Sequence, residues 1–440
     1  MAETLWRHRD FRLLWAGDTI SQFGTQVTVL ALPLLAVTAL HATPFEVGLL
    51  TTFEFLAFLL VGLPAGAWVD RMRRRQVLIT GDLGRALLLG SLPVAAWLDI
   101  LTLPQLYAVA LAAGVLTVFF DVAYQSYLPH LVGVDHLVEG NAKLQASQSV
   151  SVVAGPSAGG FLVQALTAPY AVLVDAASFL WSALCVGGIR AREPRPERAP
   201  DRNLRREIGE GLRFVLGHRL LRDISGCTST FNFFNTISGS MLIILLARDL
   251  GLPAGTIGLF FSVGSAGAIL GAVISARTAQ WLGQGRTIWL STCVGGLFGL
   301  AIPLTQRGWT LWAVAAAGAV VSFTIPIYNI TQVSFRQALA PERMLGRMNA
   351  TIRFIVWGTM PVGGLVGGVL GSTIGVRATL WVGAVGQALS FLWVYLSPLR
   401  HMRELPTRPE EDGGGVLPDP VQPAPMPPAG PLAEAQTPVE

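Results

Sequence analysis

Residues 62–78 read GLPAGAWVDRMRRRQVL and place five charges, Asp70 and four arginines, between two long apolar runs. The chain otherwise uses few charges. Of its 440 residues, 13% are charged and 52% are hydrophobic, whereas a soluble domain carries about 25% charged residues. The mean hydropathy is +0.54. These values predict a membrane protein in which this short charged segment joins two spanning helices.

The apolar runs define the fold class. A helix that crosses a hydrocarbon core of about 30 Å needs about 20 apolar residues. Twelve stretches meet this requirement, so we predict an all-α membrane protein with twelve transmembrane helices. They cover residues 11–37, 46–69, 76–98, 103–128, 141–165, 169–189, 220–247, 254–277, 287–306, 309–335, 347–373 and 376–397. The charged start WRHRDFR leads into an apolar stretch too long for a signal peptide, so we expect the first helix to remain in the protein.

The arginines set the orientation of these spans. Cytoplasmic loops of membrane proteins carry an excess of Lys and Arg. Here the arginines gather at the N-terminus and in the loops after the second, sixth, eighth and tenth spans, whereas the other loops contain only Arg248, Arg307 and Arg377. We therefore expect a multi-pass protein of the cytoplasmic membrane with both termini in the cytoplasm.

An internal repeat divides the chain into two halves. A shift of 208 residues places Asn141-Ala142 on Asn349-Ala350, Gly159-Gly160 on Gly367-Gly368, and Asp121 on Asn329. A shift of 210 residues places Gly48 on Gly258. These matches predict two pseudo-symmetric six-helix bundles in parallel repeat. We expect an N-terminal bundle over residues 1–190 and a C-terminal bundle over residues 218–398.

Two polar stretches lie outside the bundles. Residues 191–217 begin with REPRPERAPDR and continue with apolar residues at helical spacing. We expect a cytoplasmic linker whose amphipathic helix lies on the membrane surface. Residues 399–440 are rich in proline, glycine and acidic residues, and we expect a disordered cytoplasmic tail.

Polar residues form stripes on four of the apolar spans. The stripe on the first helix of each half consists of Asp18, Gln22, Thr25 and Thr28, and of Thr228, Asn232, Asn235 and Ser238. Asp121 and Gln125 mark the fourth span, and Tyr328, Asn329 and Gln332 mark the tenth. A polar stripe inside a membrane faces water or another helix rather than lipid. The stripes predict a central aqueous cavity, with hydrogen bonding between helices as the alternative.

The sequence lacks the motifs that are typical of several classes of function. The single lysine, Lys143, lies in GNAKL, which cannot form a Walker A loop. Cys185, Cys227 and Cys293 share no CxxC spacing, and the sequence contains no HExxH, GxSxG or clustered His/Cys set. The basic residues lie in short segments between spans, where they indicate topology rather than nucleic-acid binding. We predict no enzyme activity, no cofactor and no metal site.

The segment between the second and third spans carries a family resemblance. Together with twelve spans in two repeats and a long central loop, GAWVDRMRRR resembles the major facilitator superfamily, over residues 5–397. The family's loop motif runs Gly, three residues, Asp-Arg, one residue, Gly and two basic residues. Gly66, Asp70, Arg71, Arg74 and Arg75 match this motif, and an arginine replaces the second glycine. The resemblance implies a gating role, in which Asp70 pairs with a neighbouring helix. The alternative is a simple topology signal, for which the arginines alone suffice.

The fifth span carries a second motif. Its GPSAGG, with Gly155, Pro156, Gly159 and Gly160, looks like the core of the motif of drug/proton antiporters, although Ser151 replaces a further glycine. ISQFGTQVTVLALPLLA and FFDVAYQSYLPHLV look similar to the macrolide and siderophore exporter branch, which implies efflux. The glycines are also compatible with close helix packing alone.

Ionisable residues inside the predicted spans need a reason to be there, because each is costly in a membrane. They are Asp18, Glu54, Asp82, Arg85, Asp121 and Asp175. Asp82 and Arg85 are three residues apart on one helix and can pair with each other. Asp18, Glu54 and Asp121 are our candidates for proton coupling or recognition of substrate charge, with Gln22, Asn232, Asn235 and Asn329 on the polar stripes. Arg353 either pairs with Asp70 or extends toward the membrane surface.

These observations predict a monomeric secondary transporter that works by alternating access. We expect proton-coupled efflux of hydrophobic or amphipathic small molecules, of the antibiotic or siderophore type, with the lipid bilayer as the surroundings. Uptake, a lipid-like substrate and a non-transporting membrane sensor remain the alternatives.

Overall fold

The computed structural model describes residues 5–69, 71–133, 136–191, 193 and 204–403. Every regular element in these ranges is helical, and twelve helices or helix pairs are long and apolar enough to cross a membrane. The prediction of an all-α fold with twelve transmembrane helices is therefore confirmed. Asp70, most of the segment 191–203 and the tail from residue 404 onward lie outside the described residues.

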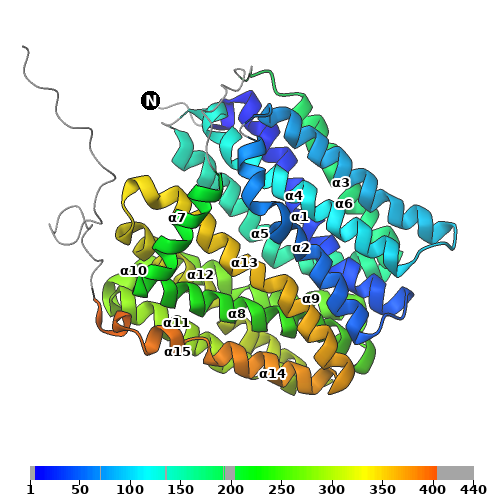
Figure 1. Cartoon of the computed structure of the whole chain (residues 1–440). Helices are drawn as coiled ribbons and strands as arrows, with labels where there is room; N and C mark the ends of the chain where they lie inside the picture. Colours follow the sequence, from blue (N-terminus) through cyan, green and yellow to red (C-terminus); the bar gives the residue numbers. More distant parts are fainter. Residues whose placement is uncertain (1–4, 70, 134–135, 192, 194–203, 404–440) are drawn as a thin grey trace, which may run out of the picture.

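The helices form two sets of six spans, and Figure 1 shows one set above and to the right of the other. The first set contains α1 (Arg9–Leu34), α2 (Pro44–Val69), α3 (Arg74–Trp97), α4 (Leu103–Val132), α5 (Leu137–Leu166) and α6 (Ala168–Gly187). The second contains α8 (Arg219–Ile244), α9 (Ala254–Ser265) with α10 (Gly267–Leu282), α11 (Gln284–Gly299), α12 (Trp309–Leu339), α13 (Glu342–Thr373), and α14 (Val376–Leu389) with α15 (Leu392–Tyr395). We call these sets the first and second bundles.

The internal repeat is visible in the element boundaries. Helices α1 and α8 begin 210 residues apart, at Arg9 and Arg219, and also end 210 residues apart, at Leu34 and Ile244. Each continues into a five-residue π-helix, η2 (Leu35–Ala39) and η4 (Leu245–Asp249). The turns that follow both contain a residue with positive φ, 51° at His41 and 52° at Gly251. The two halves therefore repeat in backbone conformation as well as in sequence.

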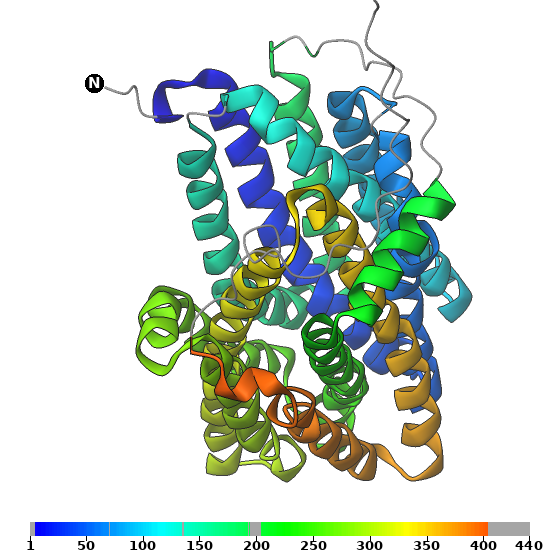
Figure 2. The same ribbon diagram turned by 60° about the vertical axis from the view of Figure 1, so that its left-hand side comes forward.

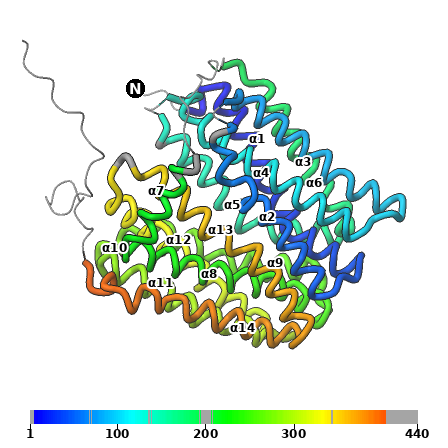
Figure 3. The backbone as a smooth tube through the Cα atoms, in the orientation of Figure 1, coloured from blue at the N-terminus to red at the C-terminus, as the bar shows by residue number. Residues whose placement is uncertain are grey.

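The two ends of the molecule differ in how the bundles meet. We call the end where α2 meets α3 and α12 meets α13 the arginine-rich end, and the end where α1 meets α2 and α8 meets α9 the opposite end. One apolar cluster at the opposite end combines residues of both bundles, such as Leu35 and Val47 with Ile244 and Ile257. At the arginine-rich end each bundle has a cluster of its own, one within residues 5–191 and one within residues 214–402. In the backbone trace of Figure 3 the two bundles accordingly diverge from each other toward the left of the view.

The linker helix α7 (Leu204–Gly217) packs against α13 and α8, as Figure 2 shows. Glu210 pairs with Arg347 at 2.5 Å, and Val215 is fully buried in the apolar cluster of the second bundle. Arg206 also donates to Glu210 and thereby lowers the pKa of that carboxyl. The sequence analysis placed this helix on the membrane surface. In the structure Val215 of this helix is buried in the second bundle, and contact of the helix with the membrane surface stays a prediction.

Candidate transport site

The two bundles meet along two helix pairs, α2 with α13 and α5 with α9. Glycines bring the backbones together in both pairs. A Cβ added to Gly48 would lie 2.5 Å from the Cα of Gly368, and one added to Gly258 would lie 3.0 Å from the Cα of Gly160 and closer still to the carbonyl oxygen of Pro156. Small residues are what permit such close helix contact inside a membrane. No side chain fits at these crossings unless the helices move apart.

The two crossings are equivalent in the repeat. The shift of 210 residues relates Gly48 to Gly258, and the shift of 208 residues relates Gly160 to Gly368. The glycines that correspond in the sequence are therefore contacts of corresponding helix pairs, Gly48 with Gly368 and Gly258 with Gly160. The two pseudo-symmetric halves therefore form the same kind of glycine contact at both helix crossings.

The helix-five motif is divided between two partners. Pro156 and Gly160 face α9 of the second bundle, whereas Gly155 packs on Gln26 and Gly159 on Val27, both in α1 of the same bundle. Half of the motif thus serves packing within the bundle and half serves the contact between bundles. All of these are packing contacts, and the role of the motif in antiport stays a prediction.

Polar bonds that link the bundles also lie at the crossings or at the opposite end. Ser157 donates its backbone N–H to Ser262 Oγ at 3.0 Å, and Gly255 donates its own to Gln164 Oε1 at 3.0 Å. The Thr52 hydroxyl donates to the carbonyl oxygen of Pro361 at 3.1 Å. Arg248, at the end of η4, donates to the carbonyl oxygen of Ala42 in the loop after η2. The bundles are thus fastened at this end by both backbone contact and hydrogen bonds.

We expect Arg248→Ala to shift the protein away from the conformation that is closed at the opposite end. The lost hydrogen bond joins the two bundles and is partly buried, so its loss costs about 1 kcal/mol, or about fivefold in the population of that conformation. Distances between spin labels on the two bundles at the opposite end measure the shift. Arg307→Ala is the matched control, because Arg307 donates to the carbonyl oxygens of Leu250 and Gly251 within its own bundle. Equal distance changes in both variants would refute the role of Arg248.

A cavity of about 260 Å³ separates the bundles toward the arginine-rich end. It lies between α2, α4 and α13, and its lining includes Phe58, Gly66, Val122, Arg353 and Trp357. The Arg353 guanidinium lies 4.8 Å from the centre of the Trp357 ring, and Phe58 meets the same ring edge-on at 4.5 Å. The cavity wall is therefore mainly aromatic and apolar with one cation. Asp70 lies outside the described residues, so the pair between Arg353 and Asp70 stays a prediction.

The described residues of the loop motif have different surroundings. Gly66 lines the cavity between the bundles, and a Cβ added to it would meet no atom within 4 Å. The backbone N–H groups of Arg74 and Arg75 donate to the carboxylate of Glu193, which caps the start of α3. The Arg75 side chain donates to the carbonyl oxygens of Val186 and Gly187 at the end of α6. Arg71 is exposed.

The polar stripe of α1 lines a hollow of about 500 Å³ inside the first bundle, between α1, α4 and α5. Asp18 and Gln22 face Tyr124 across it, and Asn141, Gln145 and Gln148 of α5 complete its polar lining. Asp18 is only 6% exposed. Glu54 of α2 lies one helical turn before Phe58, and it has no hydrogen-bond or ion-pair partner among the described residues.

The corresponding stripe in the second bundle serves two purposes. Asn232 and Asn329 line a hollow of about 70 Å³, in which the hydroxyls of Thr228 and Tyr328 lie 2.6 Å apart. Asn235 instead accepts a hydrogen bond from Gln387 at 3.0 Å. The stripes thus line hollows inside each bundle and bond to other helices, whereas the cavity between the bundles is lined by other residues. The central aqueous cavity predicted from the stripes stays a prediction.

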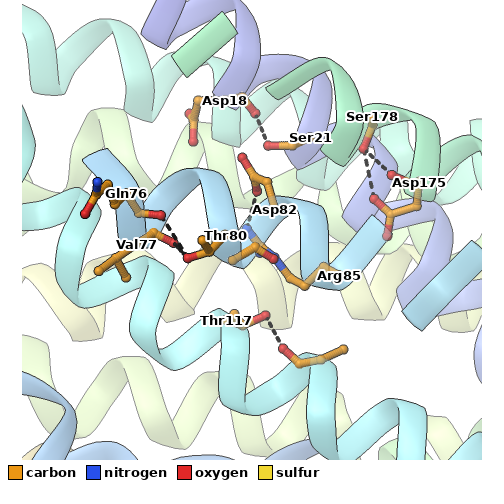
Figure 4. Close-up of polar contacts among 12 residues, drawn as sticks. Asp18, Ser21, Gln76, Val77, Thr80, Asp82, Arg85, Thr117, Asp175 and Ser178 are labelled. Carbon is orange, nitrogen blue, oxygen red and sulfur yellow. Dashed lines mark hydrogen bonds and ion pairs between the residues drawn. The ribbon is translucent and has the colours of Figure 1, made fainter. Parts of the chain in front are cut away.

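A group of charged residues lies inside the first bundle, shown in part in Figure 4. Asp82 and Arg85 of α3 form an ion pair at 2.5 Å, with side chains 0% and 7% exposed. The Arg85 guanidinium lies between the rings of Phe120 and Phe179, 4.3 and 4.1 Å from their centres. Asp175 of α6 accepts a hydrogen bond from Ser178 at 3.0 Å. The predicted Asp82–Arg85 pair is confirmed.

The sequence analysis treated the other carboxylates of the first half one by one, and the structure brings them together. Arg85 faces Asp121 and Asp175 as well as Asp82, and Asp18 faces Asp82 and Asp121. Asp175 in particular was not among our site candidates. A count of the acidic residues inside the predicted spans would have indicated the group, because the first half has six and the second half has one, Asp223.

Two six-helix repeats that close on each other at one end and part at the other define a membrane transport protein. The chain matches the model of the Major Facilitator Superfamily over residues 14–358, with a second match over residues 224–433. It belongs to this superfamily, whose members are transporters and not enzymes, and it is a multi-pass membrane protein.

Similar proteins include exporters. The multidrug efflux pump Tap of Mycolicibacterium fortuitum is 26% identical over 397 residues, which cover 87% of this chain and 93% of that protein. The enterobactin exporter EntS of Escherichia coli (strain K12) is 25% identical over 414 residues, 91% of this chain and 94% of that protein. A bacterial homologue of the iron transporter ferroportin, solved in an inward-facing state, shares the fold with a TM-score of 0.71 at 16% identity, over 89% of this chain and 98% of that one.

Proposed function

We propose that this transporter exports hydrophobic or amphipathic small molecules, of the antibiotic or siderophore type, in exchange for protons. The observation that carries the proposal is the asymmetry of the two ends, closed by paired glycine crossings at the opposite end and parted around a cavity toward the arginine-rich end. Alternating access needs one such conformation and its converse. The similarity to two exporters over about nine-tenths of the chain supports the outward direction.

The orientation is part of the proposal. Under the positive-inside rule the arginine-rich end faces the cytoplasm, so both termini are cytoplasmic and the protein lies in the cytoplasmic membrane. The described conformation then offers its cavity to the cytoplasm, where an exported molecule is captured. We divide the chain as the sequence suggested, into bundles at residues 1–190 and 218–398, a linker at 191–217 and a tail at 399–440, and we propose that it works as a monomer.

The cavity between the bundles suits an amphipathic substrate. Phe58, Phe354 and Trp357 provide apolar and aromatic surface, and Arg353 and Asn349 provide a few polar groups. Such a combination is typical of small-molecule sites, where apolar walls bind and a few polar groups orient. We propose that Gln22, Asn232, Asn235 and Asn329 supply further polar contacts as the bundles move.

We assign gating at the arginine-rich end to Gly66, Asp70, Arg71, Arg74 and Arg75. Gly66 keeps α2 bare where it borders the cavity, so α13 can approach it when this end closes. The bonds from α3 to Glu193 and from Arg75 to the end of α6 hold the start of α3 as one rigid unit. The gate would then close by movement of whole helices rather than by a rearrangement of the loop. Asp18, Glu54 and Asp121 are the candidate proton or substrate carboxylates.

The test is accumulation of ethidium and of a panel of antibiotics in cells with and without the protein, first with the proton gradient intact and then with it collapsed. We expect lower accumulation in cells with the protein, and we expect this difference to vanish when the gradient is collapsed. Glu54→Gln and Asp18→Asn are each expected to reduce the gradient-dependent part more than about tenfold.

Three results would contradict the proposal. Higher accumulation in cells with the protein would indicate uptake. No difference across the panel would refute drug export. Full gradient dependence in both carboxylate variants would exclude Glu54 and Asp18 as coupling groups. Comparable amounts of protein in the membrane, measured through a tag, are required for every variant.

A further inference from the structure

Five residues form what we call the charge cluster of the first bundle: Asp18, Asp82, Arg85, Asp121 and Asp175. They come from four helices, α1, α3, α4 and α6, and they face one another inside the bundle. The cluster combines four carboxylates with one guanidinium. If every member were ionised, it would hold a net charge of −3.

The one cation of the cluster, Arg85, already has an ion-pair partner. Arg85 pairs with one oxygen of Asp82 and is enclosed by the rings of Phe120 and Phe179. The other oxygen, Asp82 Oδ2, is fully buried and makes no hydrogen bond of normal geometry with the described residues, although the Ser182 side chain of α6 lies close to this carboxylate. Figure 4 shows Asp82 between Arg85 and Asp18, with Asp175 on the side of α6. A bare carboxylate oxygen in an enclosed site is a place for a proton.

The remaining carboxylates lack countercharges of their own in this bundle. Asp175 is 1% exposed, and its described contacts are the hydroxyls of Ser178 and Thr28. Burial of an ionised carboxylate without a paired cation costs several kcal/mol, and such groups neutralise instead. The charge balance of the cluster therefore favours bound protons as long as these carboxylates stay buried as in the described conformation.

The space for Asp175 is made by a glycine. A Cβ added to Gly24 of α1 would lie 2.5 Å from Asp175 Oδ1, so the carboxylate occupies room that a side chain on α1 would fill. At the equivalent crossing of the second bundle, Gly383 replaces Asp175 and Phe234 replaces Gly24, according to the repeat shifts of 208 and 210 residues. The first bundle thus accommodates a buried acid where the second accommodates a ring.

The repeat supplies an internal control for all five positions. The same shifts relate the cluster to uncharged residues of the second bundle, namely Thr228, Thr292, Gly295, Asn329 and Gly383. The first four of these line one small hollow, so they too come together in space. The same helix arrangement therefore folds with neutral residues at every equivalent position. Packing does not require the charges, and their presence in one bundle alone points to function.

We infer that the coupling proton is taken up inside the first bundle, at Asp82 and Asp175 beside Arg85, and that the second bundle binds no coupling proton. The inference rests on the proposed proton-coupled transport. The proton binds to the buried carboxylates when the opposite end is open, and it is released through the hollow lined by Asp18 in the described conformation, as exchange for an exported molecule requires. The ionisable groups that face this pair of carboxylates are Arg85, which faces both, and Asp18, which faces Asp82. Asp121 in turn faces Arg85 and Asp18, and Tyr124 faces Asp18.

Asp121 connects this site to the cavity between the bundles. It faces Arg85 within the first bundle and Arg353 of α13 in the second, and its neighbours Val118 and Val122 line the cavity. A change of charge in the cluster therefore acts on a cation of the opposite cavity wall. This gives proton binding a direct route to the contact between the bundles.

The experiment uses the full-length protein reconstituted in liposomes, with ethidium as the transported probe. We compare Asp175→Asn and the double variant Asp82→Asn/Arg85→Gln, in which no buried arginine is left unpaired, with the wild type. Both variants are expected to lose gradient-driven ethidium transport by more than about tenfold and to keep exchange of ethidium without a gradient. Asp223→Asn, which removes a buried carboxylate of the second bundle, is the matched control and is expected to keep gradient-driven transport.

A second measurement does not depend on transport. The infrared difference spectrum of the wild type between neutral and alkaline pH, above the range in which ordinary carboxylates protonate, is expected to contain a carboxylic acid C=O band that is reduced in Asp175→Asn and unchanged in Asp223→Asn. Gradient-driven transport at the wild-type level in both cluster variants, or an unchanged band in Asp175→Asn, would overturn the inference. Absence of gradient-driven transport in the wild type would instead overturn the proposed function, and the infrared result would still decide where protons bind.

Discussion

Gly258→Val is expected to reduce transport by more than about tenfold without unfolding the protein. The Cβ of the valine would collide with the carbonyl oxygen of Pro156 and the Cα of Gly160, which are backbone atoms of α5 and cannot turn aside. The helices α5 and α9 must then move apart, and the protein can no longer close the opposite end. A transporter that cannot adopt one of its two closed conformations does not complete a cycle.

Two measurements check this expectation. Transport is measured in cells, and closure is measured by the reaction of an impermeant maleimide with a cysteine introduced at Ser262, with the three native cysteines replaced. We expect faster labelling in Gly258→Val than in the wild type. Gly239→Val is the matched control, because Gly239 lies in a spanning helix and a Cβ added to it would meet no atom within 4 Å. Wild-type transport in Gly258→Val would show that this crossing takes no part in the cycle.

Asp82→Leu is expected to lower the free energy of unfolding by about 3–5 kcal/mol, because it leaves the buried Arg85 guanidinium without its counterion. The double variant Asp82→Leu/Arg85→Leu is expected to recover much of this loss, since it removes both charges and leaves no buried ion without a partner. Unfolding of the purified protein in detergent, followed for the wild type, both single variants and the double variant, gives the coupling energy directly.

Glu210→Gln provides the comparison for this cycle. The Arg206–Glu210 pair is also intrahelical, but its side chains are 74% and 36% exposed, compared with 7% and 0% for Arg85 and Asp82. Exposed ion pairs contribute little to stability, so we expect Glu210→Gln to leave the unfolding transition nearly unchanged. A similar loss in Glu210→Gln and Asp82→Leu would mean that burial does not govern the Asp82–Arg85 pair.

Much of the fold could be predicted because, inside a membrane, the structure of each spanning segment depends mainly on its own residues. Each spanning segment must satisfy its own backbone hydrogen bonds, so a stretch of about 20 apolar residues is a helix in almost any context. All twelve predicted spans correspond to helices in the structure. The amphipathic helix of the linker was predicted as well, but its partner was not. Its apolar stripe fits a membrane surface and a protein groove equally, and the sequence carries no information about which is nearby.

The site was predictable only in its parts. The Asp82–Arg85 pair follows from a spacing of three residues on one helix, and the polar stripes follow from helical periodicity. The meeting of Asp175 with this pair does not, because α3 and α6 are separated by two other spans. Likewise, the repeat related Gly48 to Gly258 and Gly160 to Gly368, but equivalence in a repeat does not say which glycine contacts which.

The sequence by itself determined the number and place of the spans, their division into two related halves, and the separation of arginine-rich from arginine-poor loops. These are properties of single segments and of their order along the chain. The tertiary structure alone decided which end is closed, which glycines cross, and that four carboxylates from four helices form one group with Arg85. Those features depend on how helices far apart in the chain pack together. The segment at residues 62–78 shows the same division, since its arginines mark one end of the molecule, and only the packed helices show Gly66 at the wall of the cavity.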